Sequence, residues 1–308
     1  MKRSKKILFI GSKILGLRCL MEMYNLNLNS IAGVLTVDDR DDGRSVFEEF
    51  EKFSSDKRIS FYAARNKIEA EKIIKQVAPE MCFVVGWYWI IGKKTLESVP
   101  GGFLGIHHSL LPKYRGGSPL VWAMINGEKV VGTTLFSFAE GMDNGDIWAQ
   151  EKVDVGDNDY ISDMLAKLEE KAVSILKEKY ISILEGKIKP VPQDHKKATF
   201  CAQRVPEDGM IDWTMSAVEI YNFIRAQSEP YPGAFTFFDD RKLIIRKAHM
   251  DDVVYYGTPG QVARRSEDFV YVICGDNRPV VLETVEYDGK KLSAGSTIKS
   301  IKTRFKNS

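Results

Sequence analysis

Two of the chain's four histidines stand side by side in a segment rich in glycine and proline, Gly105–Pro119. The segment follows an apolar run, Phe103–Ile106, that predicts a buried strand. Loops at the carboxyl ends of parallel strands are where α/β proteins place their sites. Because imidazole exchanges protons near neutral pH, His107 and His108 are candidates for acid–base chemistry, the alternative being structural histidines at a strand end.

An acidic residue, Asp143, stands in the turn Gly141–Asp146, after an alternating strand pattern at Gly132–Phe138. An aspartate between glycines is usually only a turn former. If the fold brings it close to His107, however, the carboxylate can hold the imidazole in one tautomer and stabilise its protonated form. The two residues together would suit proton transfer, and neither establishes it alone.

The elements that must position these residues read as an α/β domain. Short apolar runs at Ile7–Gly11, Ile31–Val37 and Met81–Val85 alternate with helical patterns such as Ile68–Val77. That alternation predicts a mostly parallel sheet covered on both faces. The longest helical pattern, Asp159–Leu184, closes this part of the chain.

A second part of the chain has a different pattern. Pro190 and Pro192 lie in a lysine-bearing stretch typical of a connection between domains. One short helical pattern, Met215–Gln227, is then followed by turn-punctuated strand patterns that suggest a small β-barrel or sandwich: Ala234–Phe238, Leu243–Arg246, Gly260–Ala263, Phe269–Cys274 and Val280–Val285. We therefore expect two domains, residues 1–200 and 201–308.

Composition narrows the classes of function. The 308 residues are 44% hydrophobic and 28% charged, with a formal net charge of +2, which does not indicate a nucleic-acid partner. The four cysteines are far apart, so neither a disulfide framework nor a metal site is expected. No run approaches the roughly 18 apolar residues of a membrane span, and Ile7–Ile10 is too short for a signal peptide. We expect a cytoplasmic protein with no membrane partner.

The run from His107 to Ile147, HHSLLPKYRGGSPLVWAMINGEKVVGTTLF…GMDNGDI, closely resembles the folate-dependent formyltransferases. Their pattern is Asn-x-His-x-Ser-Leu-Leu-Pro followed by a strand and an Asp-x-Gly turn. Arg204–Trp213 and Pro230–Phe235 are similar to the second-domain signature of the methionyl-tRNA and nucleotide-sugar branches. The resemblance implies an α/β, Rossmann-like formyltransferase domain with a mostly parallel sheet, followed by a smaller C-terminal domain like an open β-barrel (OB-like).

The resemblance also implies N10-formyltetrahydrofolate as the formyl donor. His107 matches the family's catalytic histidine and Asp143 its aspartate. Two segments match the walls around the pterin ring, which makes these residues candidates for binding the donor: Gly86, Trp87, Tyr88, Trp89 and Ile90 on one side, Gly141 and Met142 on the other. Without the family, the aromatic cluster would read as core.

The residue types suit formyl transfer. A neutral amine attacks the formyl carbon, an oxyanion forms, and the departing folate nitrogen needs a proton. His107 can stabilise the oxyanion, while Asp143 handles the proton and favours the charged imidazole.

One position departs from the family. Gly105 stands where the family has an asparagine that donates a hydrogen bond to the formyl oxygen. Loss of one such donor typically costs about 10²–10³ in rate. Three explanations stay open: His108 or Asn144 acts as a substitute donor, a backbone N–H or water does, or the protein is slow or inactive. The retained His107, Asp143 and pterin segments favour an active enzyme.

The acceptor is predicted from the loop after the second strand. The tRNA enzymes usually carry a basic Gly-Arg-Gly-Lys-like loop there, whereas this chain has Asp38–Arg44, with four acids and two arginines. Acids repel a polyanion. We therefore expect a nucleotide-linked amino sugar (dTDP-, UDP- or GDP-linked), as in lipopolysaccharide biosynthesis, with tRNA as the alternative. Lys113, Tyr114 and Arg115 are candidates for contacting the sugar or phosphate, or else form a solvated loop.

Two other classes stay open at this point. A hydrolase could use the same histidine and aspartate to pass the formyl group to water. A non-catalytic folate or nucleotide binder is suggested only by Gly105. The pattern is also compatible with a homodimer.

Overall fold

The computed structural model describes residues 6–306, and the chain divides into two compact units. The first contains the N-terminal part up to residue 116, together with 132–153 and 167–200. The second contains 117–131, 154–166 and the chain from 201 onward. The expected domains, 1–200 and 201–308, meet at the same position as the last boundary between the two units, after residue 200. They differ over 117–131 and 154–166, because α5 (Pro119–Ile125) packs against α7 (Ala217–Gln227) of the second unit.

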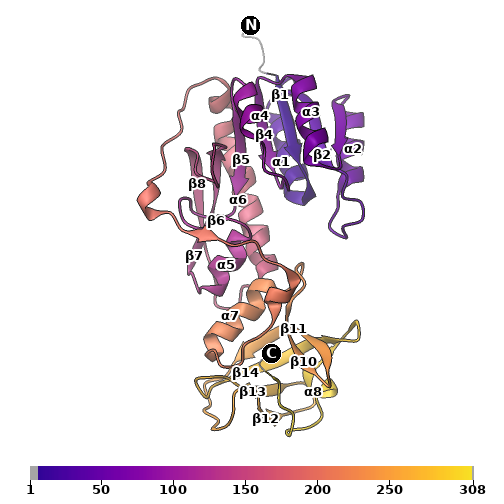
Figure 1. Cartoon of the computed structure of the whole chain (residues 1–308), viewed down its shortest axis with the longest axis vertical. Helices are drawn as coiled ribbons and strands as arrows, with labels where there is room; N and C mark the ends of the chain where they lie inside the picture. Colours follow the sequence, from indigo (N-terminus) through magenta and orange to yellow (C-terminus); the bar gives the residue numbers. More distant parts are fainter. Residues whose placement is uncertain (1–5, 307–308) are drawn as a thin grey trace. The chain divides into compact units, whose positions relative to one another are not determined.

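The first unit is built on a seven-stranded sheet in the order β3-β2-β1-β4-β5-β7-β8 (Figure 1). Its β1 pairs in parallel with β2 and β4, and β4 pairs in parallel with β5, whereas β7 runs antiparallel to β5. The mostly parallel α/β sheet is therefore confirmed. The strands are β1 Ile7–Gly11, β2 Ile31–Val37, β3 Ser60–Ala64, β4 Met81–Val85, β5 Phe103–His107, β7 Val130–Ser137 and β8 Ile147–Asp154.

Helices cover both faces of this sheet. Alternate residues of β1 point to opposite faces, so that Phe9 packs with Leu20 and Leu176 while Leu8 packs with Ile74. One apolar cluster therefore lies under α1 and α6 and the other under α3. The helices of this part are α1 Lys13–Leu26, α2 Phe47–Asp56, α3 Lys67–Val77, α4 Lys93–Ser98 and α6 Ile161–Leu184.

The strands with continuous apolar runs were predicted, as were β5 and β7 (from Phe103–Ile106 and Gly132–Phe138), whereas β3 and β8 were not. The predicted Ile7–Gly11, Ile31–Val37 and Met81–Val85 coincide with β1, β2 and β4, which are almost wholly buried. The edge strand β3 is only partly buried and carries no such run, so the pattern did not reveal it. No element was predicted for Phe47–Asp56 either, which forms α2.

The second unit is a six-stranded antiparallel sheet in the order β10-β11-β14-β13-β12, with β15 also paired to β14. This confirms a smaller C-terminal antiparallel domain after the α/β domain. Trp213 is fully buried in its core. The elements are α7, β10 Ala234–Phe238, β11 Arg241–Met250, β12 Val262–Arg265, β13 Val270–Ile273, β14 Pro279–Tyr287, β15 Lys290–Ser293 and α8 Ala294–Thr297.

Short elements complete the chain: β6 Arg115–Gly116 pairs with β9 Phe200–Cys201, and two 3₁₀ turns cover His195–Lys197 and Pro206–Gly209. Within residues 6–306, none of the helices has both the length and the apolar character needed to cross a membrane.

Candidate active site

His107 is the last residue of β5, next to the carboxyl end of β4. Its Nε2 lies 2.8 Å from the backbone oxygen of Tyr114. Because a carbonyl oxygen only accepts, Nε2 carries a hydrogen and donates it. The backbone of Tyr114 thereby fixes the ring, and Nδ1 is the nitrogen that can exchange a proton.

Asp143 lies beside that nitrogen. Its Oδ2 is 3.7 Å from His107 Nδ1 and accepts a 2.7 Å hydrogen bond from the Gly116 N–H. Asp143 has a left-handed backbone, with φ 46°. The fold thus brings the two predicted residues together, and it places a carboxylate beside the imidazole nitrogen that does not bond Tyr114.

A buried network holds the turn that carries Asp143. Gln193 Nε2 donates to the backbone oxygens of Asp143 (2.9 Å) and Gly145 (2.6 Å). Gln193 Oε1 in turn accepts from Arg115 Nε (3.1 Å) and Nη2 (2.6 Å), and both side chains are at most 5% exposed. Burial lowers the pKa of Arg115, against the opposing effect of Asp143.

Arg115 is therefore committed to supporting the turn, and its contact with an acceptor stays a prediction. Gln193 was not predicted as part of the site, because Pro190 and Pro192 indicated a connection between domains in that segment. Nothing in its residue type signals that it reaches the Asp143 turn, since that depends on the path of the chain.

The other two residues predicted near the acceptor, Lys113 and Tyr114, form hydrogen bonds through their backbone groups. The Tyr114 N–H donates to Thr199 Oγ1 (2.8 Å), while its carbonyl holds His107. The backbone oxygen of Lys113 accepts from Ser109 Oγ (2.7 Å). Contacts of the Lys113 and Tyr114 side chains with substrate stay predictions.

The two candidate substitute donors differ in their surroundings. Burial, and then the neighbouring His107, lower the pKa of His108 to about 4, so it is neutral at neutral pH. Its Nδ1 is buried without a hydrogen-bond partner among the described residues. Asn144 already donates from Nδ2 to the backbone oxygen of Glu140 (2.9 Å). A role for either at the formyl oxygen stays a prediction.

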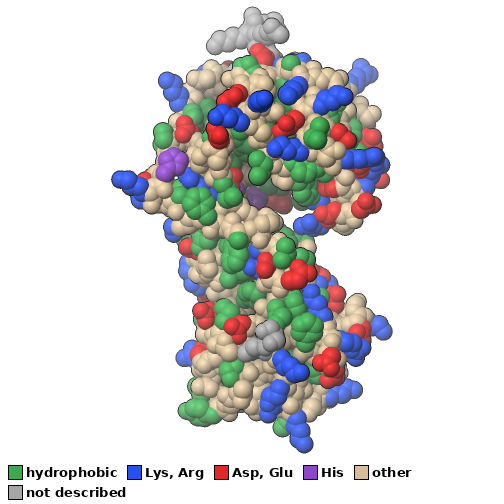
Figure 2. All heavy atoms as spheres, in the orientation of Figure 1, with side chains coloured by type: hydrophobic (Ala, Val, Ile, Leu, Met, Phe, Trp, Pro, Cys, Tyr) green, Lys and Arg blue, Asp and Glu red, His purple; other side chains and the backbone are tan. Residues whose placement is uncertain are grey.

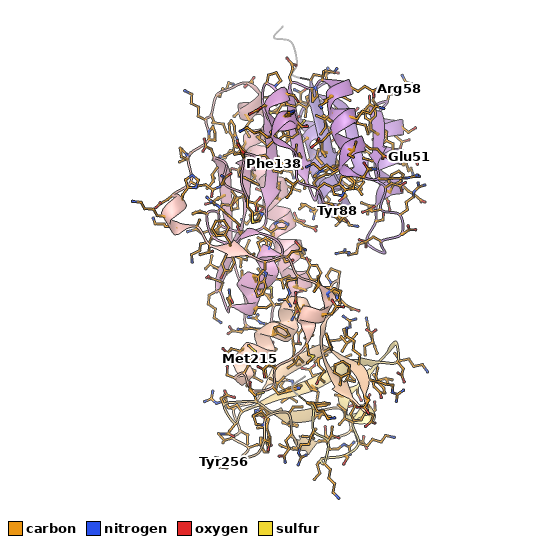
Figure 3. All side chains as sticks on the ribbon, viewed as in Figure 1. Glu51, Arg58, Tyr88, Phe138, Met215 and Tyr256 are labelled. Atoms are coloured by element: carbon orange, nitrogen blue, oxygen red, sulfur yellow. The ribbon has the colours of Figure 1, made fainter. Side chains whose placement is uncertain are left out.

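Next to the two segments expected to flank the pterin, Lys93 at the start of α4 forms an ion pair with Glu140 (2.7 Å), which precedes Gly141. Both segments expose apolar side chains: Ile90 is 83%, Met142 53% and Tyr88 50% exposed, and Tyr88 is labelled in Figure 3. Exposed apolar groups on neighbouring loops suit a flat heterocyclic ligand. The residues present therefore fit a folate.

The remaining residues of these two segments shape the backbone. Trp87 and Trp89 pack edge to face (5.1 Å) and against the core, so they also serve as core. Gly86 and Gly141 have positive φ values of 68° and 117°, which glycine adopts without strain.

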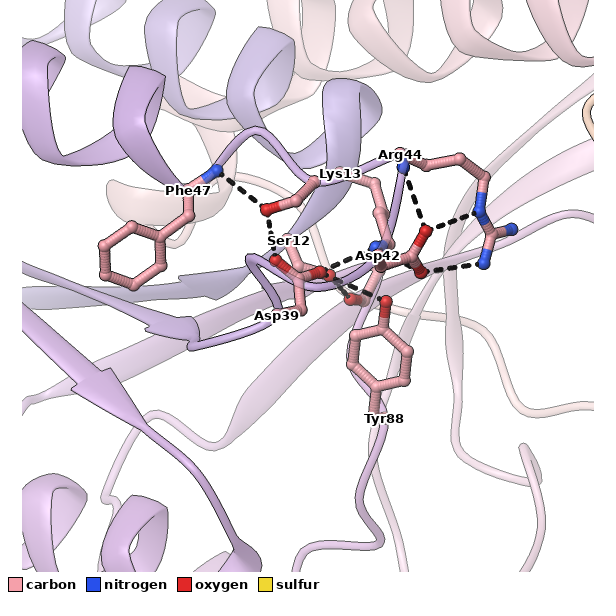
Figure 4. A network of polar contacts seen from close by, with 9 residues as sticks. Ser12, Lys13, Asp39, Asp42, Arg44, Phe47 and Tyr88 are labelled. Atoms are coloured by element: carbon pink, nitrogen blue, oxygen red, sulfur yellow. Dashed lines mark hydrogen bonds and ion pairs between the residues drawn. The ribbon is translucent and has the colours of Figure 1, made fainter.

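A polar network lies at the carboxyl ends of β1 and β2 (Figure 4). Lys13 Nζ contacts Asp39 (2.6 Å) and Asp42 (2.8 Å), and the Tyr88 hydroxyl donates to Asp39 (3.3 Å). Burial acts to lower the pKa of Lys13, but the hydrogen bonds to the two aspartates outweigh it and raise that pKa. Hydrogen bonds from Arg44 and then Lys13 lower the pKa of Asp42. The acidic loop is thus tied to the Tyr88 segment.

Two segments of the chain match known protein families. Residues 5–179 match the family described as Formyl transferase, and residues 204–302 match Formyl transferase, C-terminal domain. The chain belongs to the folate-dependent formyltransferase family. The predicted family and the transferase activity are thereby confirmed, as is N10-formyltetrahydrofolate as the one-carbon donor.

Relatives of this formyltransferase come from more than one branch. It is 31% identical over 295 residues to the methionyl-tRNA formyltransferase of Clostridium novyi (strain NT), covering 93% of each chain. Its fold is similar to the N-formyltransferase of Helicobacter canadensis solved with folinic acid and dTDP-3-aminofucose (TM-score 0.70, 16% identity, 91% of this chain and 99% of that one). The sugar 3N-formyltransferase WlaRD is also similar (TM-score 0.69, 20% identity, 91% and 98% covered).

Proposed function

We propose that this formyltransferase transfers the formyl group to the amine of a nucleotide-linked amino sugar. The observation that carries the proposal is the acidic loop Asp38–Arg44, whose cations are paired with its own acids. Arg40 donates to Asp38 (2.8 and 2.9 Å), and Arg44 donates to Asp42 (3.2 and 3.0 Å). The loop therefore offers no net positive charge to a polyanion.

Binding of tRNA depends on cations that neutralise phosphates and release counterions. Lys13, which could add a charge at this edge, is also held by Asp39 and Asp42. Basic and acidic side chains are interspersed on the visible face of the first unit, with no single basic field (Figure 2). A nucleotide sugar has only one diphosphate, so it needs fewer cationic side chains for binding than tRNA does. This acceptor fits a step of lipopolysaccharide biosynthesis.

Methionyl-tRNA is the second candidate, and one finding favours it. The relative at 31% identity over nearly its whole length is named a methionyl-tRNA formyltransferase. The basic tail, with lysines and arginines between Lys290 and Lys306, would be its electrostatic contact.

The chemistry of the site serves either acceptor amine. The donor supplies the formyl carbon. Protonated His107 Nδ1 donates to the oxyanion that develops when the amine attacks, while Tyr114 holds the opposite edge of the ring. Asp143, held by Gly116, takes the proton that the attacking amine loses. The departing nitrogen receives its proton from the imidazolium as the carbon–nitrogen bond breaks, and the proton held by Asp143 then returns to His107 Nδ1.

The test is product analysis with the formyl donor and a panel of dTDP-, UDP- and GDP-linked amino sugars, next to charged initiator tRNA. We expect one amino-sugar nucleotide to gain the mass of one carbonyl and tRNA to stay unmodified. Formyl-methionyl-tRNA as the preferred product, with an affinity that falls steeply with salt, would overturn the sugar proposal. Formate as the sole product would identify a hydrolase, and no turnover with retained folate binding would identify a binder.

A further inference from the structure

Position 105 leaves no room for a side chain. A Cβ built on Gly105 would lie 2.3 Å from Cε1 of Phe138 and 3.0 Å from its Cζ. Carbon atoms in contact are normally about 3.5–4.0 Å apart. On the other side the same Cβ would lie 3.1 Å from the backbone oxygen of Val84, in the neighbouring strand. Any side chain at 105 must therefore displace the ring of Phe138.

The ring that occupies this space belongs to an aromatic series ending at His107. Gly105 lies opposite Phe136 in the β5–β7 ladder, on the same sheet face as His107. Phe136 packs edge to face with the His107 imidazole (centroids 6.1 Å apart, 71°). Phe138 packs on Phe136 from the other side (5.3 Å, 31°). Phe136 thus contacts both the His107 imidazole and the ring of Phe138.

Phe138 also shares an apolar cluster with the donor side of the site. It packs against the same buried cluster as Trp87 and Trp89, which flank the exposed Tyr88 (Figure 3 labels Phe138 and Tyr88). It is partly rather than fully buried. The aromatic series at His107 and the segment expected to hold the pterin therefore rest against one apolar cluster.

We infer that Phe138 is a positioning residue for His107, and that Gly105 is glycine because Phe138 occupies the volume of a side chain there. The inference deepens the proposed function and rests on its donor half, which is common to sugar and tRNA acceptors. At this position the chain offers an aromatic ring in place of a hydrogen-bond donor. The imidazole is then the donor to the oxyanion, and apolar surroundings strengthen its hydrogen bond.

The experiment is a double-mutant cycle on Gly105→Asn and Phe138→Ala, with kcat/KM measured for the donor. Each single variant is expected to lose about tenfold or more, the scale of one aromatic contact together with repacking. The double variant is expected to lose no more than Phe138→Ala alone, because the asparagine then has room. Phe138→Leu, which keeps most of the apolar volume, should restore most of the activity, and Phe237→Ala, on an exposed ring of the second unit, should change nothing.

A second readout separates this inference from the choice of acceptor. Imidazole ¹⁵N shifts report the Nε2–H tautomer of His107, and binding of 5-formyltetrahydrofolate reports the donor side. Neither measurement needs an acceptor. We expect both to change in Gly105→Asn and in Phe138→Ala and to return toward wild type in Phe138→Leu. A Gly105→Asn enzyme with wild-type rate and shifts, or losses that simply multiply in the double variant, would overturn the inference.

Discussion

The imidazole of His107 has two edges with different partners. Nε2 donates to the Tyr114 carbonyl, and Nδ1 faces the Asp143 carboxylate. A backbone carbonyl cannot give or take the reacting proton, so only the Nδ1 edge is available for catalysis. Tyr114 therefore orients the ring, and Asp143 is the residue placed to exchange a proton with it.

Replacing His107 by alanine should lower kcat by about 10²–10⁴, the usual share of a general acid–base group. The dissociation constant of 5-formyltetrahydrofolate should stay within about threefold of wild type, because the expected pterin contacts lie on other segments. Stopped-flow kinetics and fluorescence titration measure the two quantities. Full turnover in this variant would remove the catalytic assignment.

The Asp143→Asn substitution removes the negative charge of the side chain and keeps its shape. The amide oxygen can still accept from the Gly116 N–H, so the turn should persist. Without the negative charge beside Nδ1, we expect kcat to fall about 10²-fold with little change in melting temperature. A variant that melts far below wild type would instead give Asp143 a structural role.

His108 gives the molecule a pH-dependent stability. Burial, followed by the nearby His107, lowers the pKa of His108 to about 4, whereas an unfolded histidine titrates near about 6.5. Between these values the unfolded chain binds the extra proton, so stability is present above the higher value and is lost as pH falls. From about pH 7 to about pH 5 the loss is about 2 kcal/mol. Urea unfolding at both pH values should show it, and His108→Gln should reduce it; equal losses in both proteins would contradict it.

At the scale of elements, the catalytic turn depends on a distant segment. The Asp143 turn follows β7, and the side chain that holds its carbonyls, Gln193, comes from the stretch before β9. Arg115, at β6, completes the network by donating to Gln193. Three segments that are far apart in sequence thus define the position of one carboxylate.

Gln193→Leu should lower both stability and kcat. The buried Gly145 carbonyl and the partly buried Asp143 carbonyl lose their donor, and buried Arg115 loses an acceptor, at a cost of about 2–4 kcal/mol. Because the damage reaches catalysis through the Asp143 turn, kcat should fall more than the donor KM rises. Gln76→Leu, on an exposed face of α3, is the matched control and should behave as wild type. A stability loss with unchanged kcat would make Gln193 merely structural.

At the scale of the whole molecule, the two compact units do not follow the order of the chain. Residues 117–131 and 154–166 belong with the C-terminal unit, although His107 precedes them and Asp143 lies between them. Arg225 of α7 is one reason. It is buried and donates to the backbone oxygens of Gly156 (2.9 Å) and Asp159 (3.0 Å). The interleaved segments therefore supply hydrogen-bond partners that a fragment starting at 201 would lack.

Arg225→Met should destabilise the protein by about 2 kcal/mol, because the backbone oxygens of Gly156 and Asp159 and the buried Asn222 side chain lose a charged donor. Chemical denaturation followed by circular dichroism measures the change. Arg241→Met is the matched control, since Arg241 pairs with Asp288 on the surface and should change stability by at most about 0.5 kcal/mol. Equal effects in the two variants would show that the segment 154–166 does not depend on Arg225.

The sequence by itself determined the fold class and the family, and it predicted the pair of residues proposed for the centre of the site. Buried parallel strands are continuous apolar runs, so β1, β2 and β4 were readable, and the loop after β5 was expected to carry the site. The His107–Asp143 pair followed from the family pattern, and these two side chains lie next to each other in the structure.

What only the tertiary structure decided is how that pair is held. Gln193, the Tyr114 carbonyl and the Phe138 ring act on residues far along the chain or through the backbone, and no local pattern marks such contacts. The acidic loop is the other case: its charges were readable, but their pairing with Arg40, Arg44 and Lys13 was not. Gly105 shows the difference most directly, because the family pattern marks it as an exception, whereas only the packing shows that Phe138 occupies the volume of a side chain there.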